Sequence, residues 1–263
     1  MKALCMALSV MTSVPAAASV PVRRADTSGK FAFVGFGTYQ TGFGGEIPLC
    51  TFSILRHGLL LTAKHCFTHL GSSTKPVKVK NLSVIFPGLV SLSGSALKEI
   101  ILDPGPNDIA YVRYEATRTE GVIALPSIKV GRGLPALEAE LQMPGFPNAP
   151  AKNRKLALSL PCALNGRHDR FPPKAKDAGY EGELWEMACP AWRGQSGSPL
   201  IEELDGAVTV YGVLTHTFQV NSDGSIDDSA VETDEFGKFV LLSAYSPLFL
   251  AERLDALLEP KDQ

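Results

Sequence analysis

Short apolar or alternating segments recur along most of the chain, and Gly, Pro, Asn and Ser separate them. Strands in all-β proteins are short and bounded by such turn residues, whereas βαβ units need long helical segments between strands. The pattern therefore favours an all-β sandwich or barrel, with a hairpin turn at residues 56–58. The segments predicted to be strands are residues 31–39, 51–55, 58–63, 77–86, 97–102, 109–114, 139–143, 155–160, 208–216 and 239–245.

The end of the chain has a different pattern. Ser246 stands at a helix N-cap position with Pro247 directly after it, and Pro260 follows an apolar stripe formed by Leu250, Leu254, Leu257 and Leu258. A capping serine, a first-turn proline and leucines at helical spacing predict a helix. We expect a C-terminal helix and tail over residues 246–263. The acidic run 221–238 is predicted to be a surface loop.

The start of the chain resembles a targeting segment. Lys2 is followed by an apolar run too short to span a bilayer and by small residues at 16–18. This pattern is typical of a secretory signal peptide, which we place at residues 1–18. Residues 19–30 are then either a propeptide or an N-terminal arm, and Arg23–Arg24 is either a dibasic processing site or a charged part of that arm. No later segment has an apolar run long enough for a membrane-spanning helix.

Size and charge narrow the class of protein. The chain has 263 residues, 45% of them hydrophobic, which is enough for one large core or two modest ones. A net charge of −2 gives no reason to expect a nucleic acid or an acidic membrane as a partner. We expect an exported monomer. The Asn81 sequon would carry a glycan only in a eukaryotic secretory route.

The cysteines point to disulfides. Removal of the signal peptide leaves four, which can form two disulfides in three ways. Pairing of nearest neighbours closes two short loops. A zinc site at His65, Cys66 and His69 is the alternative, but no CxxC motif accompanies these residues. The nearest-neighbour pairs are Cys50–Cys66 and Cys162–Cys189.

Three polar residues stand in short motifs: His65 in TAKHC, Asp108 in DIA and Ser196 in GQSGSP. Each alone has a purely structural explanation, such as a satisfied polar group after a strand or a tight turn. Together, in this order, the motifs resemble TAAHC, DIA and GxSGxP of the chymotrypsin-like serine peptidases. The resemblance spans roughly residues 30 to 250.

This resemblance implies both a fold and a mechanism. The fold would be two six-stranded antiparallel β-barrels, at residues 31–120 and 121–245, with the active site between them. Ser196 would be the nucleophile, His65 the general base and acid, and Asp108 the group that holds the imidazole. The backbone N–H groups of Gly194 and Ser196 would form the oxyanion hole. The substrate would be a polypeptide, without cofactor or metal, and the Cys50–Cys66 disulfide would brace the turn at His65.

The resemblance also assigns substrate-binding positions and shows departures from the trypsin type. Gln195 replaces the acid that pairs with an inserted N-terminus, so activation is expected not to use an N-terminal ammonium. Pro190 replaces an acid in the specificity pocket, so no strong preference for Lys or Arg is expected. The neighbour of the histidine, Lys64, is expected to face solvent. Gln195, Ser198 and the segment MPGFP (143–147) are closer to the glutamyl-endopeptidase branch. The substrate-binding candidates are Pro190, Arg193, Thr215, His216 and Thr217, with the Thr215 hydroxyl directed to Asp108.

Two other functions remain to be compared. A catalytically inactive homologue acting as a binding protein would keep the fold without turnover. An α/β-hydrolase esterase needs G-x-S-x-G, with its Asp and His after the serine, and the segment GQSGS does not fit that motif.

Overall fold

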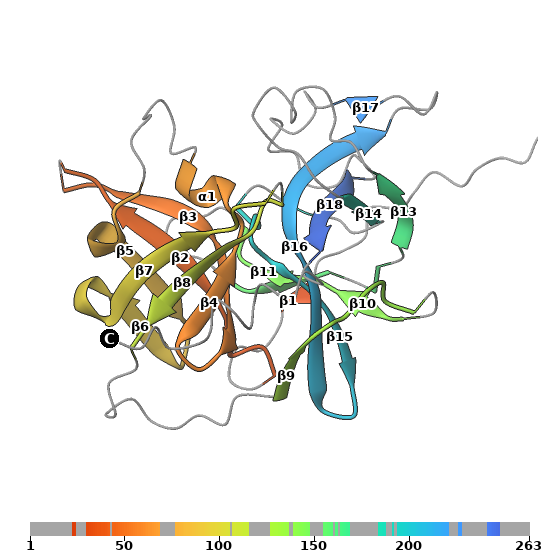
Figure 1. The fold of residues 1–263 in the computed structure, drawn as a ribbon, viewed down its shortest axis with the longest axis horizontal. Helices are drawn as coiled ribbons and strands as arrows, with labels where there is room; N and C mark the ends of the chain where they lie inside the picture. Colours follow the sequence, from red (N-terminus) through yellow and green to blue (C-terminus); the bar gives the residue numbers. More distant parts are fainter. Residues whose placement is uncertain are drawn as a thin grey trace, which may run out of the picture.

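The structure is a computed structural model (Figure 1). It describes residues 23–24, 30–42, 44–68, 77–105, 107–115, 127–136, 139–147, 155–159, 161–162, 164–168, 184–187, 191, 194–220, 226–227 and 241–247. Within these ranges the regular structure is almost entirely β, which confirms the all-β class. The described helical segments are α1 (His65–Thr68) and two 3-10 turns, η1 (Val79–Asn81) and η2 (Gly94–Ala96). No helix in the described part of the chain is long and apolar enough to cross a membrane.

The first half of the chain forms a seven-stranded antiparallel sheet in the order β6-β5-β2-β3-β4-β8-β7. The predicted turn at residues 56–58 joins β3 to β4, with Gly58 at a φ of +82°. Apolar residues alternate along β5, so one face of that strand packs into the core. The strands are β2 (Val34–Gln40), β3 (Glu46–Arg56), β4 (Leu59–Thr62), β5 (Leu82–Phe86), β6 (Val90–Ser93), β7 (Leu97–Leu102) and β8 (Ala110–Tyr114).

This sheet cannot be flat. Its edge strands β6 and β7 are joined only by η2, which spans three residues. Seven flat strands would place the edges about 29 Å apart at about 4.8 Å per strand. The connection from Ser93 to Leu97 reaches about 15 Å at most, at 3.8 Å per Cα step. The sheet therefore curls strongly toward its own edge.

The second half of the chain forms an eight-stranded sheet on the other side of the molecule (Figure 1). Its main path is β10-β15-β16-β18-β14-β13, and β9 and β17 also pair with β16. The β9 pairing is parallel, which the expectation of purely antiparallel barrels did not include. The strands are β9 (Ser127–Val130), β10 (Leu141–Gln142), β13 (Leu164–His168), β14 (Leu184–Met187), β15 (Pro199–Leu204), β16 (Ala207–Val220), β17 (Ile226–Asp227) and β18 (Leu241–Pro247).

A third, small sheet brings the N-terminal arm into the fold. Strand β12 (Ala157–Leu158) pairs on one side with β11 (Pro144–Gly145) and on the other with β1 (Arg23–Arg24). At these two residues the arm is thus a strand of the folded protein. The predicted signal peptide at residues 1–18 lies outside the described residues.

Two clusters of buried side chains form the core. The larger lies on the first sheet and includes Phe33, Phe52 and Phe86; the smaller lies in the second half around Trp185. Phe146, which follows β11, belongs to the larger cluster and packs on Phe36 with ring centroids 5.1 Å apart. The two halves of the chain therefore share apolar contacts near β11.

The expected start of the C-terminal helix is wrong. Ser246 and Pro247 end strand β18, where they pair with Val213 and Gly212 of β16. The pairing partner on β16 satisfies their backbone, and a proline at a strand end costs little because its missing N–H is at the edge of the ladder. Residues 248–263 lie outside the described residues. Within the predicted surface loop 221–238, residues 226–227 form β17.

Candidate active site

His65 and Asp108 are brought together by two neighbouring strands. Strand β4 ends at Thr62, three residues before His65, and β8 begins at Ala110, two residues after Asp108. The strands pair with Thr62 opposite Ala110. The paired ends of β4 and β8 therefore place the two polar residues side by side, as the motifs predict.

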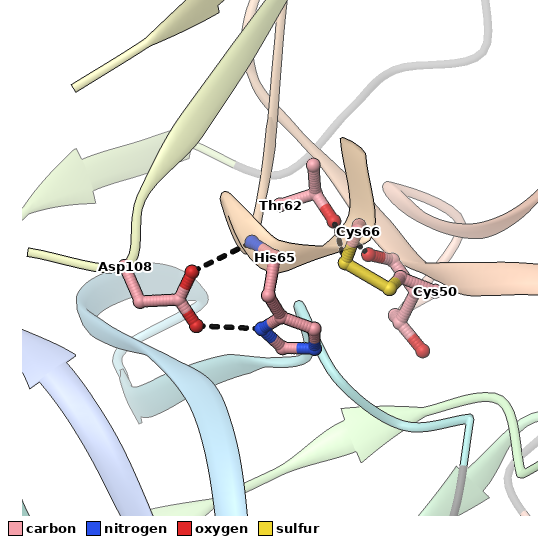
Figure 2. Close-up of polar contacts among 6 residues, drawn as sticks. Cys50, Thr62, His65, Cys66 and Asp108 are labelled. Atoms are coloured by element: carbon pink, nitrogen blue, oxygen red, sulfur yellow. Dashed lines mark hydrogen bonds and ion pairs between the residues drawn. A yellow bond between two sulfur atoms is a disulfide. The ribbon is translucent and has the colours of Figure 1, made fainter. Parts of the chain in front are cut away.

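The carboxylate of Asp108 contacts His65 twice (Figure 2). Its Oδ1 accepts the backbone N–H of His65 at 2.7 Å, and its Oδ2 lies 2.6 Å from Nδ1 of the ring. Asp108 is 0% exposed, whereas the His65 side chain is 16% exposed. An ionised carboxylate only accepts hydrogen bonds, so the Asp108 contact favours the imidazole tautomer with its proton on Nδ1, in which Nε2 is the basic nitrogen.

A disulfide fixes the turn that carries His65. Cys66, the next residue, is bonded to Cys50 on β3, with 6.1 Å between the two Cα atoms. This confirms the first predicted disulfide. The sulfur atoms of Cys50 and Cys66 lie close to a ring nitrogen of His65, but as a disulfide they offer no thiolate to a zinc ion. His69, the remaining ligand of the zinc alternative, lies outside the described residues.

Ser196 occupies a tight turn between two glycines. Ser198 N–H donates to Gln195 O at 2.8 Å, so residues 195–198 form a β-turn with Ser196 second and Gly197 third. Gly194 and Gly197 have φ values of +90° and +84°. A positive φ at the third position is the mark of a type II turn and favours glycine.

The Ser196 turn lies against the strands that lead to His65. Ser196 O accepts the N–H of Thr51 at 2.8 Å, and Gly197 N–H donates to Leu214 O on β16, also at 2.8 Å. A Cβ added to Gly197 would collide with Thr51 O and Thr62 Oγ1. The turn is thus held between β3, the end of β4 and β16. It sits beside the segment that carries His65.

The turn also presents backbone donors. No acceptor among the described residues takes a hydrogen bond from the N–H of Gly194 or of Ser196. Pairs of such N–H groups beside a nucleophile can bind a developing oxyanion. These are the two donors that the resemblance implies.

Gln195 is buried behind the turn. It and Ser198 pack against Gly145 of β11, where an added Cβ would meet the Ser198 hydroxyl. The amide carries no charge, so this position offers no ion pair to an N-terminal ammonium. Strand β12 lies between β11 and β1 in the small sheet, so the N-terminal arm is two strands away from the strand that packs on Gln195 and Ser198.

Of the five substrate-binding candidates, three lie on β16 and two lie outside the described residues. Thr215 is 2% exposed on β16, directly after the residue that bonds the Ser196 turn. The backbones of His216 and Thr217 lie on the same strand, opposite Ala244 and Ser243 of β18. The structure does not describe the remaining candidates, Pro190 and Arg193.

Cys162 is disulfide-bonded, and its predicted partner Cys189 is also outside the described residues.

Two residues near the site have roles that the sequence did not predict. The expectation that Lys64 faces solvent is wrong: its ammonium donates to Asp103 O at 3.1 Å and Gly105 O at 3.0 Å. Thr51, buried in an apolar strand, accepts the N–H of Phe146 on its Oγ1 at 2.9 Å and the Thr62 hydroxyl on its carbonyl at 2.7 Å. A threonine within the apolar segment LCTFSIL was the available signal for such a role.

Comparison with known proteins adds no constraint on the function. No family model matches the chain, and no curated protein matches it. The motifs and the geometry are therefore the basis of any functional assignment.

Proposed function

We propose that this protein is a secreted serine endopeptidase of the chymotrypsin-like class, hydrolysing peptide bonds through Ser196, His65 and Asp108. One observation carries the proposal. The buried Asp108 carboxylate binds both N–H groups of His65, beside a glycine-framed turn that carries a serine. A buried carboxylate that orients an imidazole next to a serine is the arrangement that activates a hydroxyl nucleophile.

In this mechanism Ser196 Oγ attacks the scissile carbonyl and His65 Nε2 takes its proton. The N–H groups of Gly194 and Ser196 stabilise the oxyanion of the tetrahedral intermediate. The C–N bond then breaks, His65 donates its proton to the leaving amine, and an acyl-enzyme forms on Ser196. Water deprotonated by His65 hydrolyses that ester and regenerates the hydroxyl. Asp108 holds the Nδ1 proton and stabilises the imidazolium throughout.

Two six-stranded barrels are the architecture we propose. In the first sheet, β6 and β7 flank a three-residue 3-10 turn. If they are counted as one interrupted strand, the curled sheet has six. The separate apolar cluster around Trp185 supports a second barrel in the other half of the chain.

A polypeptide fits the edge of β16. On the side of β16 away from β18, the structure describes no strand paired with residues 216–218. An extended substrate can add to such an edge through main-chain hydrogen bonds. Because Pro190 is not acidic, we propose no strong preference for Lys or Arg at the cleaved bond. Export is supported by the signal-like residues 1–18 and by the Cys50–Cys66 disulfide.

Labelling with a fluorophosphonate probe tests the proposal. The wild-type protein should react once, at Ser196, and S196A should not react. S198A is the matched control, because the Ser198 hydroxyl is buried in the same turn without a hydrogen-bond partner among the described residues. It should label like the wild type.

The outcomes separate the candidate functions. Failure of the folded wild type to label would contradict the proposal and favour the inactive homologue. Labelling that survives in S196A would show that another residue is the nucleophile.

A further inference from the structure

The residue before His65 is connected to the loop that carries Asp108. Lys64 Nζ donates to the backbone carbonyls of Asp103 and Gly105, at 3.1 and 3.0 Å. The N–H of Lys64 also donates to Asp108 O, at 3.3 Å. One residue on the His65 segment thus contacts the Asp108 loop near its start and near its end.

This loop joins β7, which ends at Leu102, to β8. It is closed at its base, where Asp103 N–H donates to Ile109 O at 3.0 Å. At its start, Gly105 N–H donates to Asp103 Oδ1 at 2.9 Å, which forms a small turn. This turn directs the Asp103 and Gly105 carbonyls to the Lys64 ammonium.

An ammonium that donates to two carbonyls of one turn restrains that turn more strongly than a neutral donor would, because hydrogen bonds from charged donors are shorter and stronger. Lys64 is half-buried, so its ammonium loses part of its hydration when it donates to these two carbonyls. Lys64 directly precedes His65, so its contacts link the Asp108 loop to the His65 segment. Displacement of the turn at Asp103–Gly105 would shift the loop that carries Asp108, whose carboxylate binds His65.

We propose that Lys64 is a positioning residue, which holds the Asp108 loop against the His65 segment and so fixes the His65–Asp108 geometry. The inference rests on the proposed peptidase function. Among the described residues, no hydrogen bond or ion pair links Lys64 to β16 or to the Ser196 turn, so its loss should affect the chemical step more than binding. A misplacement of about 1 Å at a catalytic group can cost on the order of 10²-fold in rate.

The test uses saturation kinetics of fluorophosphonate labelling, which give a maximal rate, kinact, and a half-saturating concentration, KI. In K64M, which keeps the length of the side chain without its donors, kinact per folded molecule should fall by about tenfold or more. KI should stay within about twofold of the wild type. K64R, whose guanidinium can donate to both carbonyls, should recover most of kinact. The control is K98M, because Lys98 pairs with Glu115 at the exposed surface; its kinact should be unchanged.

A second measurement does not depend on activity. Amide hydrogen exchange of the non-proline residues between 103 and 109 should be faster in K64M than in the wild type and in K98M. If K64M does not fold, K64Q replaces it, since its amide can reach only one of the two carbonyls.

The possible results distinguish the two proposals. An active wild type with an unchanged kinact in K64M or K64Q overturns the role of Lys64. A wild type that does not label overturns the peptidase function, and the exchange of residues 103–109 then decides whether Lys64 holds the loop. Loss of stability in K64M with kinact per folded molecule unchanged shows that Lys64 is only a structural residue and overturns the inference.

Discussion

Gly197 and Gly206 have the same backbone conformation in different surroundings. Their φ values are +84° and +77°. A Cβ on Gly206 meets nothing within 4 Å, whereas one on Gly197 collides with Thr51 O and Thr62 Oγ1. Alanine substitutions at the two positions therefore distinguish the free-energy cost of backbone strain from the cost of displacing the Ser196 turn.

We predict that G206A loses about 1–2 kcal/mol of unfolding free energy, the cost of a left-handed alanine, and keeps the wild-type labelling rate. G197A should lose more, because the turn must also move away from β3 and β4. Its labelling rate per folded molecule should fall by at least about tenfold, since a shift of the nucleophile is costly. Urea unfolding and probe labelling measure both effects. Equal labelling by the two variants would contradict the placement of Ser196.

Two tyrosines should weaken the fold at alkaline pH. Burial, and then the negative charge of Asp103, raise the pKa of Tyr111 above its ordinary value. Burial, followed by the hydrogen bond to Glu202 and the charge of that carboxylate, raises the pKa of Tyr211 to about 12. In the folded protein both phenols therefore keep their protons at a pH where the unfolded chain has begun to release them.

The sign follows from proton binding. Above about pH 10 the folded state holds more protons than the unfolded state, so the unfolding free energy falls as the pH rises, by up to about 1.4 kcal/mol per pH unit for one buried group. This contribution is fully present below pH 10. In Y111F the decline between about pH 10 and 11.5 should be shallower than in the wild type, as measured by urea unfolding across that range. Y211F should differ less, because Tyr211 is only partly buried. An unchanged slope in Y111F would contradict this account.

At the scale of elements, β1 shows how far the N-terminal arm contributes to the site. It adds one short edge strand to β12, and the next strand, β11, packs on Gln195 and Ser198. A chain that begins after Arg24 loses this strand. We predict a loss of about 1–3 kcal/mol, because only a few main-chain hydrogen bonds disappear at about 0.5–1.5 kcal/mol each.

Activity should nevertheless persist in the trimmed chain, because the neutral Gln195 forms no ion pair with an N-terminal ammonium. Thermal unfolding and the labelling rate of chains that begin at Arg23 and at residue 25 measure the two effects. Strict dependence of activity on one particular exposed N-terminal residue would contradict the prediction.

Elements whose pattern is local were predictable. All ten predicted segments overlap a described strand, and the hairpin around Gly58 has its turn where the glycine stands. Elements defined by a distant partner were not predictable. Strand β9 is parallel to β16, and the strand ending at Pro247 exists because β16 lies beside it, although its local signals favour a helix start.

The same distinction applies to the site. His65, Asp108 and Ser196 stand in short motifs, so the sequence alone identified them as candidates. The contacts of Lys64 and Thr51 depend on loops that are 39 and 95 residues away in the chain. A cation beside a histidine and a threonine in an apolar strand give no indication of these partners. The supporting residues therefore appear only in the folded chain.

At the scale of the whole molecule, the site depends on how the two halves meet, and Thr51 is where they are connected. Its N–H binds the Ser196 turn, its hydroxyl accepts the Phe146 N–H, and its carbonyl accepts the Thr62 hydroxyl. These partners belong to the second half of the chain, to the segment after β11 and to the strand leading to His65. Loss of the Thr51 hydroxyl should therefore loosen both the junction and the site.

T51V tests this connection because valine keeps the shape of threonine and removes only the hydroxyl. The Phe146 N–H is then buried without its acceptor, which costs about 1–3 kcal/mol and lowers Tm by roughly 2–12 °C in a protein of this size. The matched control is T38V on the adjacent strand β2, because the Thr38 hydroxyl is buried without a hydrogen-bond partner among the described residues. T38V should leave Tm unchanged or raise it, since no hydrogen bond is lost. Labelling at Ser196 should slow in T51V and not in T38V. If both variants lower Tm equally and label equally, the halves are joined elsewhere and Thr51 is an ordinary core residue.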